Sequence, residues 1–414
     1  MKTKKHIIVI LSLLVIFSLP TYAHFLEEDS LGLSPESPIP IYSVEDLHRI
    51  GNNEEWTLDK HYKMMNDIAF EYPEEGQSNW TPIGDKDNWF TGSFDGNGKT
   101  IDGIVMCNFQ EITAGLIYIL YGGTIKNVKI INTTINCPRG TGAGGFVYRN
   151  MGIIDNCYFN GTIIAPEGST NGLGGIAIGN DGLIKNSGSS GNLQGGYQSA
   201  GIVCINFSIV EDCYSIMNII KSENAGGIAT FMFSSNTDLG YGDICIIRRC
   251  FSTGTIEGSN LAGGIVCDIS SDNSLIQDCY SVSDVRGGSY YGVCLGGIVG
   301  FASGNFIIER CYFNGTIISD VRTTRQFAIG SIISICNEGG FIQNCVYVRT
   351  GMGIVGNPNA TIKQLNNASI SSAKGTRTTK NLYEQAGWDF SSESPVWWFD
   401  EDTGFPQLVG VGKS

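Results

Sequence analysis

A unit of roughly thirty residues repeats through most of this chain. Gly263-Gly264-Ile265-Val266 is followed by Ile276-Gln277-Asp278-Cys279-Tyr280, and Gly296-Gly297-Ile298-Val299 is followed by Ile308-Glu309-Arg310-Cys311-Tyr312. A unit this short cannot bury an apolar face alone, so such units stack on one another. The repeat therefore predicts one continuous array rather than several separate domains.

The most regular part of the unit is an aliphatic residue followed three positions later by a small residue. This small residue is usually cysteine, and we call the series the ladder column. Its members are Val128, Cys157, Ser187, Cys213, Cys250, Cys279, Cys311 and Cys345. A small-small-aliphatic element, most often Gly-Gly-Ile, precedes each of them. The array therefore contains about eight units.

The apolar runs within each unit are short, rich in Ile and Val, and bounded by Gly, Asn, Asp or Ser. This punctuation is typical of strands and turns, and no helical period is sustained. Stacked units pair each strand with the next coil about 4.8 Å away. The prediction is an all-β, right-handed parallel β-helix, or solenoid, of about eight coils.

The chain begins with three lysines, an apolar run over 7–19, and small residues at Thr21 and Ala23. This pattern predicts a signal peptide cleaved near Ala23, and hence a secreted or cell-surface protein, with the periplasm also open. No later run is long enough to span a membrane. The predicted organisation is a signal peptide (1–23), a Pro-rich linker (24–40), an N-terminal cap with the first coils (41–110), a repeat β-helix (111–349), a polar connector (350–386) and a C-terminal cap (387–414).

Both caps have local signals. Ser43 is the expected N-cap of a short helix, with Asp46 three residues later. Phe90 to Ile101 is expected to form two strands around a Gly-rich turn. At the other end, the aromatic residues either bury one another as a cap or form a sugar-stacking platform. They are Trp388, Phe390, Trp397, Trp398 and Phe405.

The thirteen cysteines of an exported protein raise the question of disulfides. In-register side chains of a ladder point the same way, the count is odd, and Ser187 interrupts the column. We therefore favour free, buried thiols that act as small apolar residues. A bridge between Cys107 and Cys137 stays open as an alternative.

No catalytic constellation stands out. The chain has no His-Glu-x-x-His, no Cys-x-x-Cys and no Gly-x-Ser-x-Gly element with a usable histidine, so we predict neither a metal, a cofactor nor an enzyme. Removing the signal peptide would change the net charge from −14 to −17, which disfavours nucleic-acid partners. Asp212, Arg249, Asp278 and Arg310 each precede a ladder cysteine, and their alternating charge indicates ion pairs between coils.

One aromatic residue follows most ladder residues directly. Strand alternation would turn these rings outward if the ladder points inward. Such a stripe would be a binding face for a glycan or a protein, unless the rings pack at a corner or beneath a loop. The stripe consists of Tyr158, Tyr214, Phe251, Tyr280 and Tyr312. Loops that break the period, over 230–243, 287–294 and 319–327, are further carriers of recognition.

Several segments together resemble the GLUG-motif proteins of bacteria. They are Ser43-Val44-Glu45-Asp46-Leu47, Met65-Asn66-Asp67-Ile68, the 90–101 segment, the repeated Gly-Gly-Ile-Val with Cys-Tyr-Ser, Gly387-Trp388-Asp389-Phe390 and Gly404-Phe405-Pro406-Gln407-Leu408. The resemblance covers about 41–349 and 380–409. It implies an exported, often adhesin-like β-helix, sometimes attached to a peptidase. The function hypothesis is therefore a non-enzymatic binding surface; a carbohydrate-active enzyme or glycan-binding module, and a structural spacer, are the alternatives.

Overall fold

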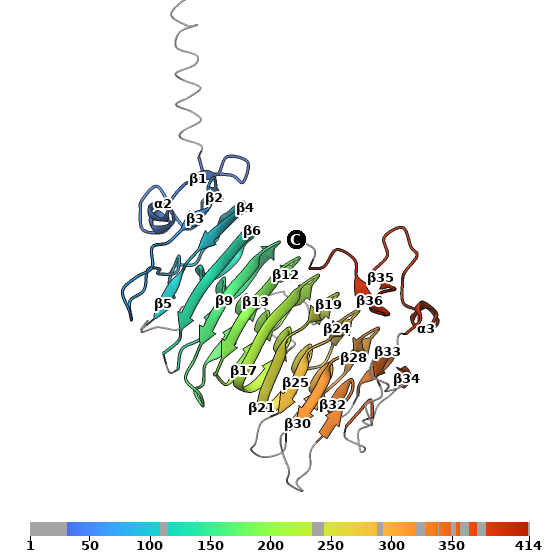
Figure 1. Ribbon diagram of the computed structural model, residues 1–414. Coiled ribbons are helices and arrows are strands. Elements are labelled where there is room, and N and C mark those ends of the chain that lie inside the picture. The colour runs from blue at the N-terminus through green and yellow to red at the C-terminus, as the bar shows by residue number, and fades with distance from the viewer. Residues whose placement is uncertain are drawn as a thin grey trace, which may run out of the picture.

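The computed structural model describes residues 31–107, 115–138, 140–233, 244–287, 293–319, 328–337, 339–348, 353–356, 364–370 and 378–412. The predicted signal peptide lies outside these residues, as do most of the residues of the predicted loops at 230–243, 287–294 and 319–327. The described chain is a parallel β-solenoid of about eight turns, as predicted (Figure 1). Its right-handed sense stays a prediction.

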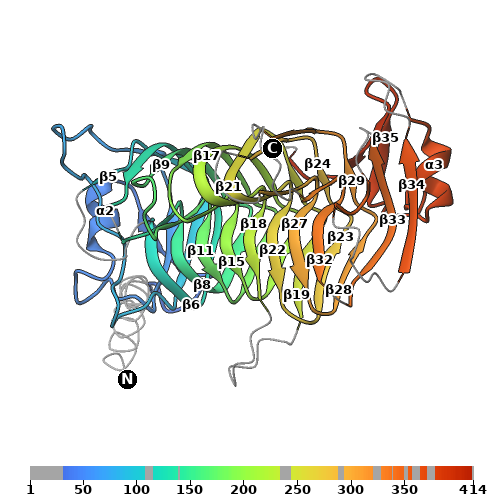
Figure 2. The ribbon, with the colours of Figure 1, turned by 90° about the horizontal axis from the view of Figure 1, so that it is seen from below.

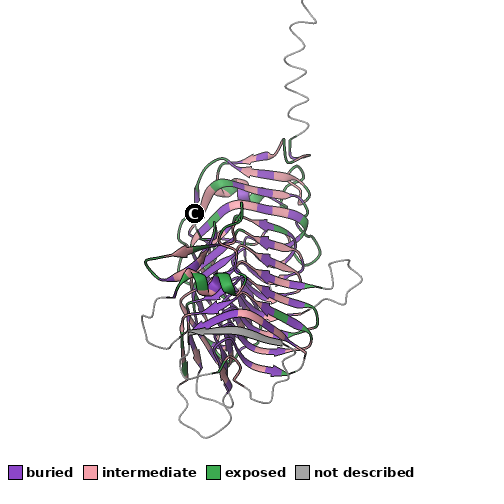
Figure 3. Cartoon of the chain, turned by 90° about the vertical axis from the view of Figure 1, so that its right-hand side faces the viewer, coloured by how far each residue is buried: buried purple, intermediate pink, exposed green. Residues whose placement is uncertain are grey.

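Register follows the sequence repeat. Ile184 pairs with Ile154 of the coil before and with Val210 of the coil after. Each in-register rung buries its aliphatic side chain, and buried residues recur in every coil along the stack (Figure 3). The core is thus one continuous apolar column, which is why no single unit needs a core of its own.

Four columns of parallel strands make up the solenoid, and β6 (Ile117–Asn136) runs through three of them. After the Gly pairs lie β8 (Val147–Asp155), β11 (Ala177–Asn180), β15 (Val203–Asn206), β18 (Ala229–Met232), β22 (Val266–Ser270), β27 (Val299–Ser303) and β32 (Ile333–Asn337). Before the ladder residues lie β1 (Ile39–Ile41), β2 (His61–Met64), β4 (Ser93–Asp102), β12 (Leu183–Lys185), β16 (Ile209–Glu211), β19 (Cys245–Arg248), β23 (Ser274–Gln277), β28 (Phe306–Glu309) and β33 (Phe341–Val348).

After the ladder residues lie β3 (Ile68–Ala69), β9 (Tyr158–Ile164), β13 (Gly188–Gln194), β17 (Tyr214–Gly226), β20 (Phe251–Ser252), β21 (Thr255–Gly263), β24 (Tyr280–Ser281), β25 (Asp284–Gly287), β29 (Tyr312–Phe313), β30 (Thr316–Ser319) and β34 (Gln364–Ile370). The short strands β5 (Val105–Cys107), β7 (Ala143–Gly144), β10 (Gly172–Gly174), β14 (Gln198–Ala200), β26 (Cys294–Gly296) and β31 (Ala328–Gly330) complete the coils.

The ladder column lies at a corner, and the structure shows why cysteine suits it. Cys279 is fully buried, and its Sγ donates to the carbonyl of Gln277 at 3.2 Å. Ser187 makes the same contact with Lys185 at 2.7 Å. The corner needs a small buried side chain that can donate to the carbonyl two residues earlier. The other ladder cysteines, Cys157, Cys213, Cys250, Cys311 and Cys345, repeat the contact.

All thirteen cysteines lie within the described residues, and all are free thiols, including Cys107 and Cys137. Burial raises the pKa of the Cys157 thiol to about 12 and also raises the pKa values of Cys279, Cys311 and Cys345, so these four ladder sulfurs are neutral at physiological pH. The ladder is therefore an apolar column of small side chains and not a stack of disulfides.

The predicted ion pairs between coils are confirmed. Arg249 Nη2 lies 2.6 Å from Asp212, and Arg310 Nε lies 2.7 Å from Asp278. The residue before each ladder position is in the left-handed region, with φ of 54° at Asp212 and 50° at Arg249. These side chains therefore leave the corner outward and meet those of the neighbouring coil, which accounts for the alternating charge.

The short N-terminal helix is confirmed as α2 (Val44–Arg49), with the Ser43 side chain accepting from the Asp46 N–H. The prediction of two separate strands around a Gly-rich turn at 90–101 is wrong. This segment is one bent strand, β4, whose two halves pair in parallel with β2 and β3. The Gly-rich turn is a corner of the first coils, because a solenoid leaves no room for an antiparallel return.

The C-terminal segment contains α3 (Lys380–Gln385) and an antiparallel pair, β35 (Trp397–Asp400) and β36 (Phe405–Leu408). Figure 2 shows this segment beside the last coils, with the chain then running back along one side of the solenoid. β34 and α3 fall inside the stretch predicted as a polar connector. The aromatic side chains of the segment form a second apolar cluster with the stripe.

Candidate binding surfaces

The five stripe residues stand on adjacent rungs, apart from one gap. Tyr214 pairs with Phe251, Phe251 with Tyr280, and Tyr280 with Tyr312. Their rings stack with centroids 5.4, 4.9 and 4.9 Å apart in that order. Gly188 occupies the rung between Tyr158 and Tyr214. A Cβ there would lie 2.3 Å from the Tyr214 ring, so glycine lets that ring lean into the gap.

Most of the stripe is covered by the C-terminal segment. Tyr312 is 1 % exposed, and its hydroxyl donates to the carbonyl of Pro406 at 2.7 Å. The Tyr280 hydroxyl donates to Gln407 at 2.8 Å, and Trp397 packs against both rings. The structure thus has Tyr214, Tyr280 and Tyr312 packed beneath another segment, while Tyr158 and Phe251 are half-buried. A stripe in this position is an internal joint of the protein rather than an open face.

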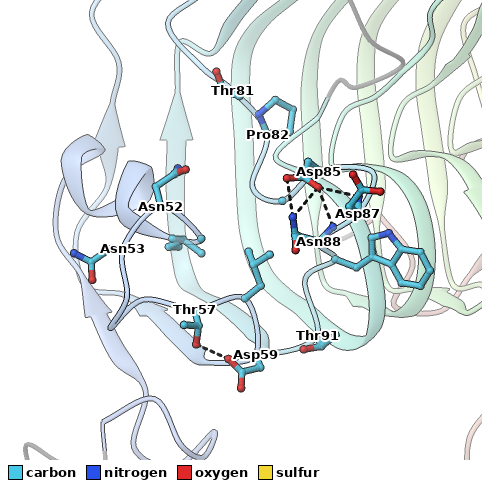
Figure 4. A pocket seen from close by; sticks show the side chains of 15 residues that line it. Asn52, Asn53, Thr57, Asp59, Thr81, Pro82, Asp85, Asp87, Asn88 and Thr91 are labelled. Carbon is cyan, nitrogen blue, oxygen red and sulfur yellow. Dashed lines mark hydrogen bonds between the residues drawn. The ribbon is translucent and has the colours of Figure 1, made fainter.

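An open cleft of about 730 Å³ lies at the N-terminal end of the solenoid (Figure 4). One wall is the turn after α2 with Asn52 and Asn53, and the other is the segment 81–91 before β4. Figure 4 shows Asn52 and Asn53 on the opposite side of the cleft from Asp85 and Asn88. The walls are joined at the base, where the N–H groups of Thr91 and Gly92 donate to the carbonyl of Leu58 at 2.9 and 3.0 Å.

The polar groups of the cleft are held by local turns. Asp85 accepts from the N–H groups of Asp87 and Asn88 at 2.8 and 2.9 Å, and from the Asn88 side chain. The hydrogen bond from the Asn88 side chain, followed by the one from the Asp87 N–H, lowers the Asp85 pKa. The Thr57 hydroxyl binds Asp59 and lowers the pKa of that carboxyl. Both groups are therefore carboxylates at neutral pH.

An exposed aromatic pair stands at the rim of this cleft. Trp89 lines the cleft and is 39 % exposed, and its ring centroid lies 5.2 Å from that of Tyr121, which is 42 % exposed. The Trp89 Nε1–H donates to the carbonyl of Lys86 at 3.1 Å, which fixes the ring on its own turn. Sequence reasoning missed this pair. The available signal was a tryptophan directly after an Asp-Lys-Asp-Asn turn outside the repeat.

The family model of the GLUG motif matches residues 291–318, which span most of one repeat unit. This match confirms that the chain contains a GLUG motif and supports the resemblance to GLUG-repeat proteins. A solved structure from Bacteroides ovatus, titled "putative immunoglobulin A1 protease", is similar over 91% of this chain and 94% of that chain, with a TM-score of 0.41 and 16% identity. No curated protein matches the sequence.

This GLUG-repeat chain brings one serine and one histidine together that the sequence did not suggest. His61 Nδ1 lies 2.8 Å from Ser93 Oγ on neighbouring rungs. Among the described residues, no acid is hydrogen-bonded to the same imidazole, so the pair lacks the third member of a triad. His48 packs against Phe70 and Trp80. The described residues also contain no group of three or more His, Cys, Asp or Glu placed to hold a metal ion.

Asp400 is half-buried at the end of β35 and accepts from the N–H groups of Asp402 and Thr403. The tips of the three period-breaking loops lie outside the described residues. None of the helices in the described part of the GLUG-repeat chain is long and apolar enough to cross a membrane.

Proposed function

We propose that this chain is an exported, non-enzymatic β-solenoid that binds neutral glycans in its N-terminal cleft, in the manner of an adhesin. The observation that carries the proposal is the exposed Trp89–Tyr121 pair at the rim of a polar cleft. The C–H faces of a sugar pack on aromatic rings, and its hydroxyls need amide and carboxylate partners. The cleft supplies both kinds of contact within one wall.

The charge of the lining supports a neutral ligand. Asp59, Asp85 and Asp87 contribute carboxylates, and the lining contains no lysine, arginine or histidine. Lys86 points its ammonium to Asp87, 3.6 Å away, where both groups are exposed. A sialylated or sulfated glycan would therefore bring its negative charge to an acidic wall whose lining contains no cationic side chain. Neutral hydroxyls, in contrast, can donate to these carboxylates.

The same groups favour binding over hydrolysis. A glycosidase needs one carboxylic acid whose pKa is raised so that it can protonate the leaving group. Hydrogen bonds from Asn88 and Thr57 shift the pKa values of Asp85 and Asp59 in the opposite direction. These two carboxylates are suited to accept hydrogen bonds from sugar hydroxyls.

The test is a glycan array that carries neutral, sialylated and sulfated glycans, probed with the purified protein. We expect signals confined to neutral glycans and their loss in Trp89→Ala. Trp398→Ala is the matched control, because Trp398 is 38 % exposed but lies in β35, on the C-terminal segment. Equal loss in both variants, no signal on any glycan, or release of shortened sugars from a bound glycan would overturn the proposal.

Export is a separate part of the proposal. It rests on the predicted signal peptide over 1–23. Expression of the full chain in a bacterial host, followed by fractionation and N-terminal sequencing, should recover a mature protein that begins at His24 outside the cytoplasm. An unprocessed chain in the cytoplasm would contradict export without bearing on the cleft.

A further inference from the structure

A second series of outward side chains leads away from the cleft along one corner of the solenoid. It follows a buried column of in-register residues, in which Leu120 pairs with Asn150, Asn150 with Asn180, Asn180 with Asn206 and Asn206 with Met232. The residue after each member stands on the corner. We call this the corner column, and its members are Tyr121, Met151, Asp181, Phe207 and Phe233.

Hydrogen bonds between buried side-chain amides fix this corner. The Asn150 side-chain amide donates to Asn180 at 2.7 Å, and the Asn180 amide donates to Asn206 at 2.7 Å. All three amides are fully buried. Because strand positions alternate, each buried member of this column places the next residue of its coil on the outer side of the backbone. Of these, Tyr121, Phe207 and Phe233 are accessible, whereas Met151 and Asp181 are covered. The buried amides therefore set the register of the corner column.

Two aromatic platforms stand on this corner. The first is the Trp89–Tyr121 pair beside the cleft. The second consists of half-buried Phe207, Phe233 and Phe231, with ring centroids 6.1 Å apart for Phe207 and Phe233 and 5.5 Å apart for Phe231 and Phe233. Three coil steps separate Tyr121 from Phe207, which corresponds to about 14 Å along the axis.

The two corner-column residues between the platforms carry no unpaired charge. Met151 occupies the first intervening rung and is 8 % exposed. Asp181 occupies the next, and both of its oxygens accept from Arg149 at 2.7 and 2.8 Å. The ion pair is bidentate and satisfies the carboxylate. The path from one platform to the other is thus apolar or neutralised, in continuity with the cleft.

We infer that the ligand is an extended, neutral glycan chain whose one end lies in the cleft and whose later sugars stack on Phe207 and Phe233. This inference rests on the proposed function and extends it to a polymeric ligand. A single sugar in the cleft cannot reach a platform about 14 Å away, whereas a linear chain presents a stackable ring face at regular intervals. The two platforms, on one straight corner, fit a linear partner.

The experiment measures affinity for a length series of the neutral glycan with the strongest array signal, as the disaccharide, tetrasaccharide and hexasaccharide. We expect the wild-type protein to bind the hexasaccharide about tenfold or more tightly than the disaccharide. The double variant Phe207→Ala/Phe233→Ala should lose that gain and keep the disaccharide affinity. Tyr197→Ala is the control, since Tyr197 is 39 % exposed and lies off the corner.

The outcomes separate the two proposals. Affinity that is independent of length, or a double variant that binds the hexasaccharide like the wild type, overturns the extended-chain inference. The cleft proposal survives that result if Trp89→Ala still abolishes disaccharide binding. Absence of binding to every glycan overturns both, and binding of a protein ligand through Phe207 and Phe233 overturns the glycan assignment of the corner. Far-UV circular dichroism of each variant verifies the fold.

Discussion

Tyr312 provides the sharpest test of the idea that the aromatic stripe is a structural joint. Its ring stacks on Tyr280 at 4.9 Å and contacts Trp388, Trp397 and Phe405, all from the C-terminal segment. Only 1 % of the residue is exposed. The substitution Tyr312→Ala therefore leaves a buried cavity between the last coils and the segment.

The size of the effect follows from these contacts. Truncation of a buried aromatic side chain to alanine costs about 3–5 kcal/mol. Tyr312→Phe removes only the hydrogen bond to the Pro406 carbonyl, 2.7 Å from the hydroxyl, and should cost about 1 kcal/mol. Local opening of the C-terminal segment should therefore increase by roughly two to three and a half orders of magnitude in Tyr312→Ala, and by less than about tenfold in Tyr312→Phe.

Native-state hydrogen exchange measures that opening directly, because the N–H groups of β35 and β36 report on the segment while those of β8 and β11 report on the distant coils. We expect loss of protection in the segment alone. Tyr158→Ala is the matched control at the half-buried end of the stripe and should change protection much less. Unchanged protection together with loss of ligand binding in Tyr312→Ala would refute the joint and restore the stripe as a binding face.

Cys279→Ser should lower the unfolding free energy by less than about 1.5 kcal/mol, because Ser187 already makes the ladder contact, whereas Cys279→Leu should overpack the corner and cost about 1–3 kcal/mol in urea denaturation. Burial raises the pKa values of the Cys157 and Cys279 thiols, so their contribution to the unfolding free energy is present below about pH 8.5 and should fall as the pH rises beyond it. In the double variant Cys279→Ser/Cys311→Ser, the unfolding free energy should depend less on pH. Thiol titration should find no reactive ladder sulfur in the folded protein and thirteen thiols after denaturation without reductant. Asp278→Ala should destabilise the C-terminal segment more than Asp212→Ala does, since Asp278 accepts from Trp397 as well as from Arg310.

The fold could be predicted because each coil of the solenoid corresponds to one repeat unit of the sequence. Ile184 and Ser187 are a degenerate member of the repeat, and they still fall on the same rungs as Val210 and Cys213. Spacing alone also placed Asp212 beside Arg249, since residues that share a corner in successive coils must meet. In a repeat array, residues that meet in successive coils occupy equivalent positions of successive units, so their contact can be predicted from the spacing alone.

Contacts made outside the repeat could not be predicted in this way. Alternation predicted outward rings at Tyr280 and Tyr312, but the side chain that covers both, Trp397, belongs to a distant segment without a period. The cleft was missed because its two walls are joined by contacts outside the repeat, those from Thr91 and Gly92 to Leu58.

The corner column could also have been predicted from the sequence. Asn150, Asn180 and Asn206 occupy equivalent positions of successive units, and Phe207 directly follows the last of them. A buried amide ladder implies an outward residue next to it, just as the ladder column implied the stripe. The same inference applied to both corners would have placed Phe207 at the surface from the sequence.

The central claim is that the ligand lies in the N-terminal cleft. The measurement that tests it most directly is hydrogen exchange of the wild-type protein with and without a saturating neutral glycan identified on the array. We expect new protection in the segment 81–91 and in the turn at 50–59, with no change over 388–408. Protection confined to 388–408, or no protection anywhere under saturating binding, would contradict it.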